Sequence, residues 1–233
     1  MNVFDSIRSA IFRPLVVAVA TAAAPLCCPA PPAAAGPCPD VEVVFARGSG
    51  EPPGLGGVGR SFVDALRPQI GARTLGVYAV SYPASTDFSN PDFPAGFIEG
   101  VRDASSHVES TAANCPNTKE VLGGYSQGAA VAGFVTSASV PPGVPASEVP
   151  KPMPPQVANH VGAVTMFGTP SDQFMKQYRA PVIVIGPLYR PKTIELCAQG
   201  DSVCGDGSNP AAHMSYTVNG MVQQAAQFAA GHL

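Results

Sequence analysis

Stretches typical of buried β-strands alternate with stretches typical of α-helices along most of this 233-residue chain. Short β-branched and apolar runs predict five strands, at residues 41–46, 74–80, 120–125, 160–167 and 192–196. Apolar residues at helical spacing predict helices at residues 58–66, 97–114, 129–137 and 216–230. Strands that alternate with helices form a parallel sheet covered by helices on both faces. The sequence therefore predicts an α/β fold.

The composition indicates a folded globular protein that does not bind nucleic acid. Glycine and proline together contribute 50 residues, yet 45% of the residues are apolar and the formal net charge is only −3. Disordered chains combine low hydrophobicity with high net charge, so this excess does not indicate disorder. Charged residues make up 12% of the chain, against ~25% in typical domains. No lysine or arginine run is present that could follow a phosphate backbone, and we expect no nucleic-acid partner.

The first 35 residues have the pattern of a secretory signal peptide. Arg8 and Arg13 precede an apolar run at residues 15–26, and residues 33–35 are alanines that suit a cleavage site. A membrane anchor is the alternative, but the run is too short, because a spanning helix needs about 20 apolar residues. We expect cleavage near Ala35. Residues 36–233 would then be one exported domain without a stable membrane span.

The sequence predicts export more clearly than it predicts the final location of the exported domain. A lipid anchor at Cys27 or Cys28 stays open, although Pro25 and Leu26 fit the corresponding motif poorly. The sequence predicts a secreted protein and does not decide whether it is retained in the cell wall.

Removal of residues 1–35 leaves four of the six cysteines: Cys38, Cys115, Cys197 and Cys204. No pair has the Cys-x2-Cys spacing of a zinc site, and no histidine lies at metal spacing from another, so we expect no metal. Four cysteines in an oxidising compartment allow three disulfide pairings. Cys197 and Cys204 can close a short loop, which leaves Cys38 to pair with Cys115.

Residues 124–128 (GYSQG) have the form Gly-x-Ser-x-Gly. The string alone is weak evidence, because glycine is abundant in this chain. Its setting is informative, since an apolar strand precedes Ser126 and an alanine-rich helix follows it. A serine on such a strand-to-helix turn has a strained backbone and needs small neighbours on both sides. We interpret Ser126 as a nucleophile rather than as an incidental serine in a glycine turn.

A serine nucleophile needs a base, and His213 is the best of four candidates. His107 precedes Ser126 and lies in a predicted helix, His160 opens a predicted strand, and His232 is next to the C-terminus. His213 lies in a loop after all the strands and before the last helix, where the base is found on this type of scaffold.

The base needs a carboxylate to orient it, and Asp201 and Asp206 compete for this role. Asp201 lies inside the predicted Cys197–Cys204 loop, just beyond the last strand, where a disulfide would hold it in place. We prefer Asp201 on that argument alone.

Two backbone regions can supply hydrogen-bond donors to a developing oxyanion. The N–H of Gln127 directly follows the nucleophile. The glycine-rich loop at residues 47–51 (RGSGE) leaves the first strand, and its Ser49 could offer both an N–H and a hydroxyl. A phosphate-binding loop is the competing interpretation, but the loop has no Walker lysine and no third glycine at dinucleotide spacing.

Together these residues resemble the cutinase family of serine esterases, in particular the cutinase-like proteins secreted by mycobacteria. The matching stretches span nearly all of residues 36–233, and they are residues 43–48 (VVFARG), 76–80 (GVYAV), 115–118 (CPNT), 123–128 (GGYSQG), 192–194 (KTI) with Cys197, Gly200-Asp201 through Cys204, and His213. The resemblance implies a small lidless α/β-hydrolase, a three-layer sandwich around a five-stranded parallel sheet. It also implies a triad of Ser126, Asp201 and His213, an oxyanion hole of Ser49 and Gln127, and the two disulfides inferred above.

The resemblance implies hydrolysis of carboxylic esters without a cofactor. The sequence shows no long amphipathic lid segment, so we expect an open site for short or medium acyl chains, with cutin-like polyesters or lipids as substrates. Met214, next to His213, is a candidate for the acyl-binding surface. We expect a monomer. Phospholipase or acyltransferase activity on the same fold stays open.

The sequence departs from the family pattern at Gly50, where many relatives carry a larger residue, and in one longer segment. Residues 141–155 hold seven prolines and predict a surface loop with no assigned role. A secreted surface protein that binds lipid or a partner with little catalysis is the alternative function, and this loop would be its binding surface.

Overall fold

The computed structural model describes residues 37–233, which form one compact unit. The expected signal peptide at residues 1–35 lies outside the described residues. Within the described part of the chain, no helix is both long enough and apolar enough to cross a membrane.

A five-stranded, fully parallel sheet forms the centre of the fold, in the order β2-β1-β3-β4-β5. Its strands are β1 Val41–Ala46, β2 Leu75–Ala79, β3 Lys119–Tyr125, β4 Val161–Phe167 and β5 Thr193–Leu196. β1 and β3 are interior strands with buried apolar side chains, Val41, Val43 and Val44 on β1 and Val121 and Leu122 on β3, because parallel strands covered on both faces have no solvent-facing side. The predicted parallel five-stranded sheet is confirmed.

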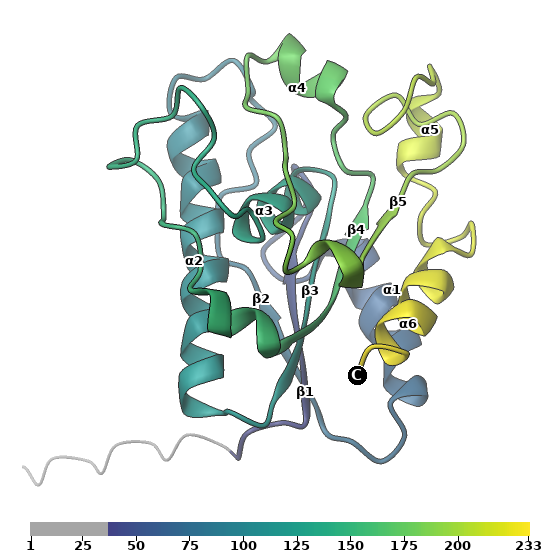
Figure 1. The fold of residues 1–233 in the computed structure, drawn as a ribbon. Coiled ribbons are helices and arrows are strands. Elements are labelled where there is room, and N and C mark those ends of the chain that lie inside the picture. The colour runs from purple at the N-terminus through teal and green to yellow at the C-terminus, as the bar shows by residue number, and fades with distance from the viewer. Residues whose placement is uncertain (1–36) are drawn as a thin grey trace, which may run out of the picture. The chain divides into compact units, whose positions relative to one another are not determined.

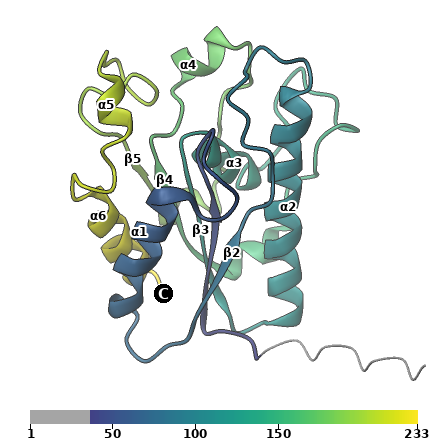
Figure 2. The same cartoon turned by 180° about the vertical axis from the view of Figure 1, so that it is seen from behind.

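Helices cover both faces of the sheet (Figures 1 and 2). On one face, α1 packs against α6, and on the other, α2 packs against α3. The α-helices are α1 Gly56–Leu66, α2 Phe93–Asn114, α3 Gln127–Val135, α4 Asp172–Gln177, α5 Pro210–His213 and α6 Met221–Ala230. Three short 3-10 helices complete the described chain: η1 Arg67–Gln69, η2 Pro155–Asn159 and η3 Arg190–Lys192. The fold is a three-layer α/β sandwich of the α/β-hydrolase type.

The carboxyl ends of all five strands point to the same edge of the sheet, because the strands are parallel. The loops after β1 and β3, together with α4 and α5, gather at this edge (Figure 1). This is the edge at which parallel α/β sheets bind ligands.

The last helix begins later than the sequence predicts. Residues 216–220 form turns, and α6 starts at Met221 after Gly220, whose φ of 85° is left-handed. Val218, placed on the buried face of the predicted helix, is 84% exposed, whereas Tyr216 is fully buried. The helical spacing of apolar residues extends by chance into residues 216–220, which form a turn. In this turn the Tyr216 side chain lies in the core.

Both predicted disulfides are present. Cys38 pairs with Cys115, and Cys197 pairs with Cys204. The first joins the segment before β1 to the end of α2, and the second closes the loop after β5.

Candidate active site

Ser126 lies at the turn between β3 and α3, in a backbone conformation that is rare for a residue with a side chain. Its φ is 55° and its ψ is −118°. A Cβ atom on Gly124 would overlap the backbone of Gly128, and a Cβ on Gly128 would overlap the carbonyl of Ala46 on β1. Both glycines are therefore required for the turn to pack against the sheet, as predicted for a strained serine turn.

Ser126 begins a continuous chain of hydrogen bonds that links three elements of the fold. His213 Nε2 lies 2.8 Å from Ser126 Oγ, and His213 Nδ1 lies 2.8 Å from Asp201 Oδ2. These residues are separated by up to 87 positions in the chain. The fold thus brings together the predicted nucleophile, base and carboxylate in hydrogen-bonding geometry.

Asp201 is fully buried and receives three hydrogen bonds. Besides His213, the donors are the hydroxyl of Tyr216, at 2.6 Å from Oδ2, and the backbone N–H of Val203, at 2.8 Å from Oδ1. Burial raises the pKa of this carboxyl, but the hydrogen bonds lower it by more, so that the pKa lies below the ordinary value. Asp201 is therefore ionised at neutral pH, as an orienting carboxylate must be.

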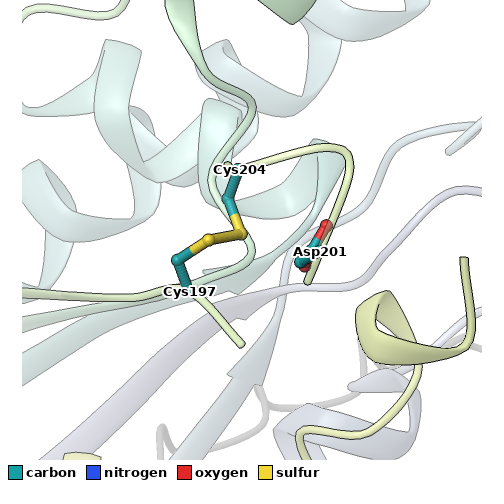
Figure 3. A group of neighbouring side chains, drawn as sticks. All are labelled: Cys197, Asp201 and Cys204. Atoms are coloured by element: carbon teal, nitrogen blue, oxygen red, sulfur yellow. A yellow bond between two sulfur atoms is a disulfide. The ribbon is translucent and has the colours of Figure 1, made fainter. Parts of the chain in front are cut away.

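The Cys197–Cys204 disulfide lies directly beside Asp201 (Figure 3). Potential ligand atoms of these three residues all lie within 4.8 Å of one another. The two sulfur atoms are bonded to each other, however, so they cannot act as the thiolate ligands that a zinc site requires. The disulfide instead constrains the short loop that carries Asp201.

Contacts to the backbone of His213, as well as those to its imidazole ring, fix the position of this residue. It ends the short helix α5, whose first turn is capped by the Asn209 side chain. The Tyr125 hydroxyl, next to the nucleophile in sequence, donates to the His213 carbonyl at 2.6 Å. Burial raises the pKa of Tyr125 to about 12, so this hydroxyl remains a donor at neutral pH.

The competing candidates lie elsewhere or contact other groups. His107 pairs with Glu42 at 3.0 Å, His232 contacts the Phe228 carbonyl, and His160 lies at the end of η2. It is Asp201, and not Asp206, that contacts His213.

The loop after β1 is fixed next to Ser126 by a buried arginine. The Arg47 guanidinium donates to the carbonyls of Tyr82 and Glu51, at 2.6 Å and 2.8 Å. The Glu51 carboxylate in turn accepts the N–H groups of Gly48 and Gly57, at 2.7 Å and 2.6 Å. These bonds close the loop into a rigid turn that carries Ser49.

Ser49, Ser126 and Gln127 line one cavity of about 460 Å³, within the range of small-molecule binding sites. Its walls are mainly apolar and include aromatic residues of α2, α4 and the loop before α2. Met214 does not line this cavity and is 71% exposed. The structure therefore does not bring Met214 into the apolar part of the site.

Three supporting residues were missed by the sequence interpretation: Tyr216, Tyr125 and Arg47. The apolar spacing predicts a helix at Tyr216, and Tyr125 occupies a variable position of the Gly-x-Ser-x-Gly motif. Arg47 belonged to a matching stretch, but no pattern indicated that it would be 4% exposed. Their partners are distant in sequence, and so no local signal could have identified their roles.

The fold and this site define an ester hydrolase of the α/β-hydrolase class. Residues 37–233 match the Cutinase family model, and the chain belongs to the cutinase family. It is 66% identical over 165 residues to a Mycobacterium tuberculosis protein named probable carboxylesterase Culp7, covering 71% of this chain and 88% of that protein. It is 46% identical over 221 residues to the phospholipase Culp4 of the same organism, covering 94% of this chain and 90% of that protein.

A solved structure of similar fold is that of Trichoderma reesei cutinase in complex with a C11Y4 phosphonate inhibitor. It has a TM-score of 0.60 and 31% sequence identity, and the match covers 84% of this chain and 77% of that chain.

Proposed function

We propose that this protein is a secreted carboxylic ester hydrolase that works through a Ser126–His213–Asp201 triad and an acyl-enzyme. The observation that carries the proposal is the pair of 2.8 Å contacts that joins Ser126 through His213 to a buried carboxylate. Ser126, at one end of these contacts, lines an apolar cavity in which the acyl part of an ester can bind.

The geometry supports a two-step reaction. His213 Nε2 takes the proton of Ser126 Oγ as this oxygen attacks the ester carbonyl, while ionised Asp201 stabilises the imidazolium. The N–H of Gln127 and the groups of Ser49, which line the same cavity as Ser126, would donate to the resulting oxyanion. His213 then protonates the leaving alcohol, and a water activated by His213 hydrolyses the acyl-enzyme.

Labelling with a fluorophosphonate tests the nucleophile directly. The wild-type protein should be labelled and should hydrolyse p-nitrophenyl butyrate. Ser126→Ala should lose labelling and about 10⁵–10⁶-fold of the rate. Ser49→Ala keeps the nucleophile and should still label. A folded wild-type protein that neither labels nor hydrolyses the ester would refute the triad and favour the lipid-binding alternative. A Ser126→Ala protein with normal activity would refute Ser126 as the nucleophile.

Secretion is supported by the signal pattern of residues 1–35 and by the two disulfides, which form in oxidising compartments. The N-terminal sequence of the protein in a culture supernatant tests this proposal, with a new N-terminus near residue 36 expected. An uncleaved, cell-retained protein would contradict it. The monomeric state stays a prediction, and gel filtration of the exported domain tests it.

A further inference from the structure

The apolar cavity continues from Ser126 along the whole of α3. The α3 residues that line it include Gln127, Ala130 and Phe134, and Ser137 and Ser139 extend the lining past the end of the helix. Positions 127, 130 and 134 are spaced by three or four residues and therefore lie on one face of α3. The cavity is thus a channel that runs parallel to α3.

The length of this channel follows from helix geometry. Val135, the last residue of α3, is nine positions after Ser126, which corresponds to about 13 Å at 1.5 Å per residue. An extended alkyl chain advances by about 1.25 Å per carbon, since bonds of about 1.5 Å meet at about 111°. The helical part alone has the length of about 11 carbons.

Aromatic side chains line the channel and pack against one another. The Phe97 ring of α2 meets the Phe134 ring of α3 edge to face, with ring centroids 5.7 Å apart. Phe88, from the loop before α2, lies 5.0 Å from Phe93 and 5.1 Å from Tyr178, at the end of α4, between ring centroids. All five residues line the cavity. Aromatic rings from α2, α3, the loop before α2 and the end of α4 therefore form much of the channel lining.

The proline-rich loop forms the remaining wall. It leaves the end of α3 and passes beside the N-terminal half of α2 (Figures 1 and 2). Val144 and Val149 of this loop, and Val140 just before it, line the channel. The charged lining residues of the loop, Glu148 and Lys151, are exposed at the surface. The inner surface that the loop offers is apolar.

We propose that this channel binds the acyl chain of long-chain esters, of about 12 carbons or more, with the proline-rich loop as its outer wall. The inference rests on the proposed function, because it places the ester carbonyl at Ser126. It replaces the expectation of short or medium chains, and it gives residues 141–155 a role in substrate selection. The channel is apolar and directly continuous with Ser126, so an alkyl chain attached to the reacting carbonyl is the occupant that fits.

A series of p-nitrophenyl butyrate, octanoate and dodecanoate, kept below micelle-forming concentrations, tests the length. Each buried methylene contributes up to about fourfold in binding. We therefore expect kcat/KM for dodecanoate to exceed that for butyrate by at least about tenfold. A decline from butyrate to dodecanoate, with butyrate hydrolysed well, would overturn the channel and leave the proposed function intact.

Two variants measure the depth of the channel. Ala130→Leu obstructs it about 6 Å from Ser126, and should lower both the octanoate-to-butyrate and the dodecanoate-to-butyrate ratios of kcat/KM. Phe134→Trp obstructs it at about 12 Å and should lower only the dodecanoate-to-butyrate ratio. Ala146→Leu is the control, because Ala146 is exposed on the proline-rich loop and does not line the channel. Equal chain-length profiles in all four proteins would refute the assignment.

A fluorescent reporter tests the same point if Ala130→Leu does not fold. The chain has no tryptophan, so Val144→Trp places a single one in the loop wall. Ser126 Oγ displaces p-nitrophenolate from an alkyl phosphonate, its proton passing to His213, and leaves the alkyl chain bonded to the enzyme through phosphorus. A dodecyl adduct should shift the tryptophan emission to the blue, whereas an ethyl adduct should not.

The two adducts also separate the two proposals. Identical spectra for the ethyl and dodecyl adducts would refute the channel, whereas failure to form either adduct would refute the triad.

Discussion

Replacement of Glu120 by glutamine is expected to stabilise the protein by an amount that grows with pH. Glu120 lies on β3 and is fully buried, and within residues 37–233 neither carboxylate oxygen has a hydrogen-bond partner. Burial, and to a smaller extent the charge of Glu42 on β1, raises the pKa of Glu120 to about 8. The folded protein therefore keeps this carboxyl protonated at neutral pH, whereas the unfolded chain ionises it.

The size of the effect follows from this difference in pKa. An unperturbed glutamate has a pKa of about 4.3, and one pKa unit corresponds to about 1.4 kcal/mol. Between about pH 4.3 and pH 8 the folded state binds more protons than the unfolded state, so Glu120 lowers the stability as the pH rises. The penalty is about 3 to 4 kcal/mol at pH 7 and levels off near 5 kcal/mol above pH 8. Glutamine has a similar shape and cannot ionise, so it removes the penalty.

Urea denaturation followed by circular dichroism at pH 4, 6 and 8 measures the difference between the two proteins. The free energy of unfolding should be similar at pH 4 and should favour Glu120→Gln increasingly at pH 6 and pH 8. Glu99→Gln is the control, because Glu99 is exposed, and it should give no such trend. A difference between Glu120→Gln and wild type that does not change with pH would refute the reasoning.

Three further changes probe the site. Tyr216→Phe removes the hydroxyl that donates to Asp201; kcat for butyrate should fall about tenfold, and urea denaturation should show a loss of about 1.5–3 kcal/mol at pH 7. Because this bond lowers the pKa of Asp201, the loss should shrink as the pH falls through that pKa, and a constant loss would contradict the role. Asp201→Asn should lower kcat about 10⁴-fold by favouring the wrong tautomer of His213. Fluorophosphonate labelling of this variant at the wild-type rate would disprove the role of Asp201. Gly128→Ala places a Cβ against the Ala46 carbonyl and should cost about 1–3 kcal/mol of stability, together with most of the labelling rate; full labelling would show that the turn is not needed.

Much of the architecture could be predicted because its signals are local. A buried parallel strand needs a short apolar run and a covering helix needs apolar residues at helical spacing, and both patterns are written in consecutive residues. The serine turn is also local, since its glycines lie two positions before and after Ser126. The positions of the five strands, with boundaries shifted by at most one residue, followed from these patterns.

The candidate triad could be inferred from chain order and from the resemblance, but the residues that hold the triad in position could not. Tyr216 illustrates the reason. Its spacing fits a helix, and only the turn at Gly220 directs its hydroxyl to a carboxylate 15 residues earlier in the chain. Met214 shows the opposite case, because it is adjacent to His213 in sequence and yet is exposed and does not line the cavity.

The sequence by itself determined the order of the elements, the strained serine turn and which residue types were available for the chemistry. Only the tertiary structure decided that Asp201 is buried among three donors, that Glu120 is buried without one, and that the proline-rich loop walls a channel along α3. Hydrogen bonding, desolvation and cavity shape depend on groups that the fold brings together from distant parts of the chain, whereas strand and helix patterns depend on neighbours.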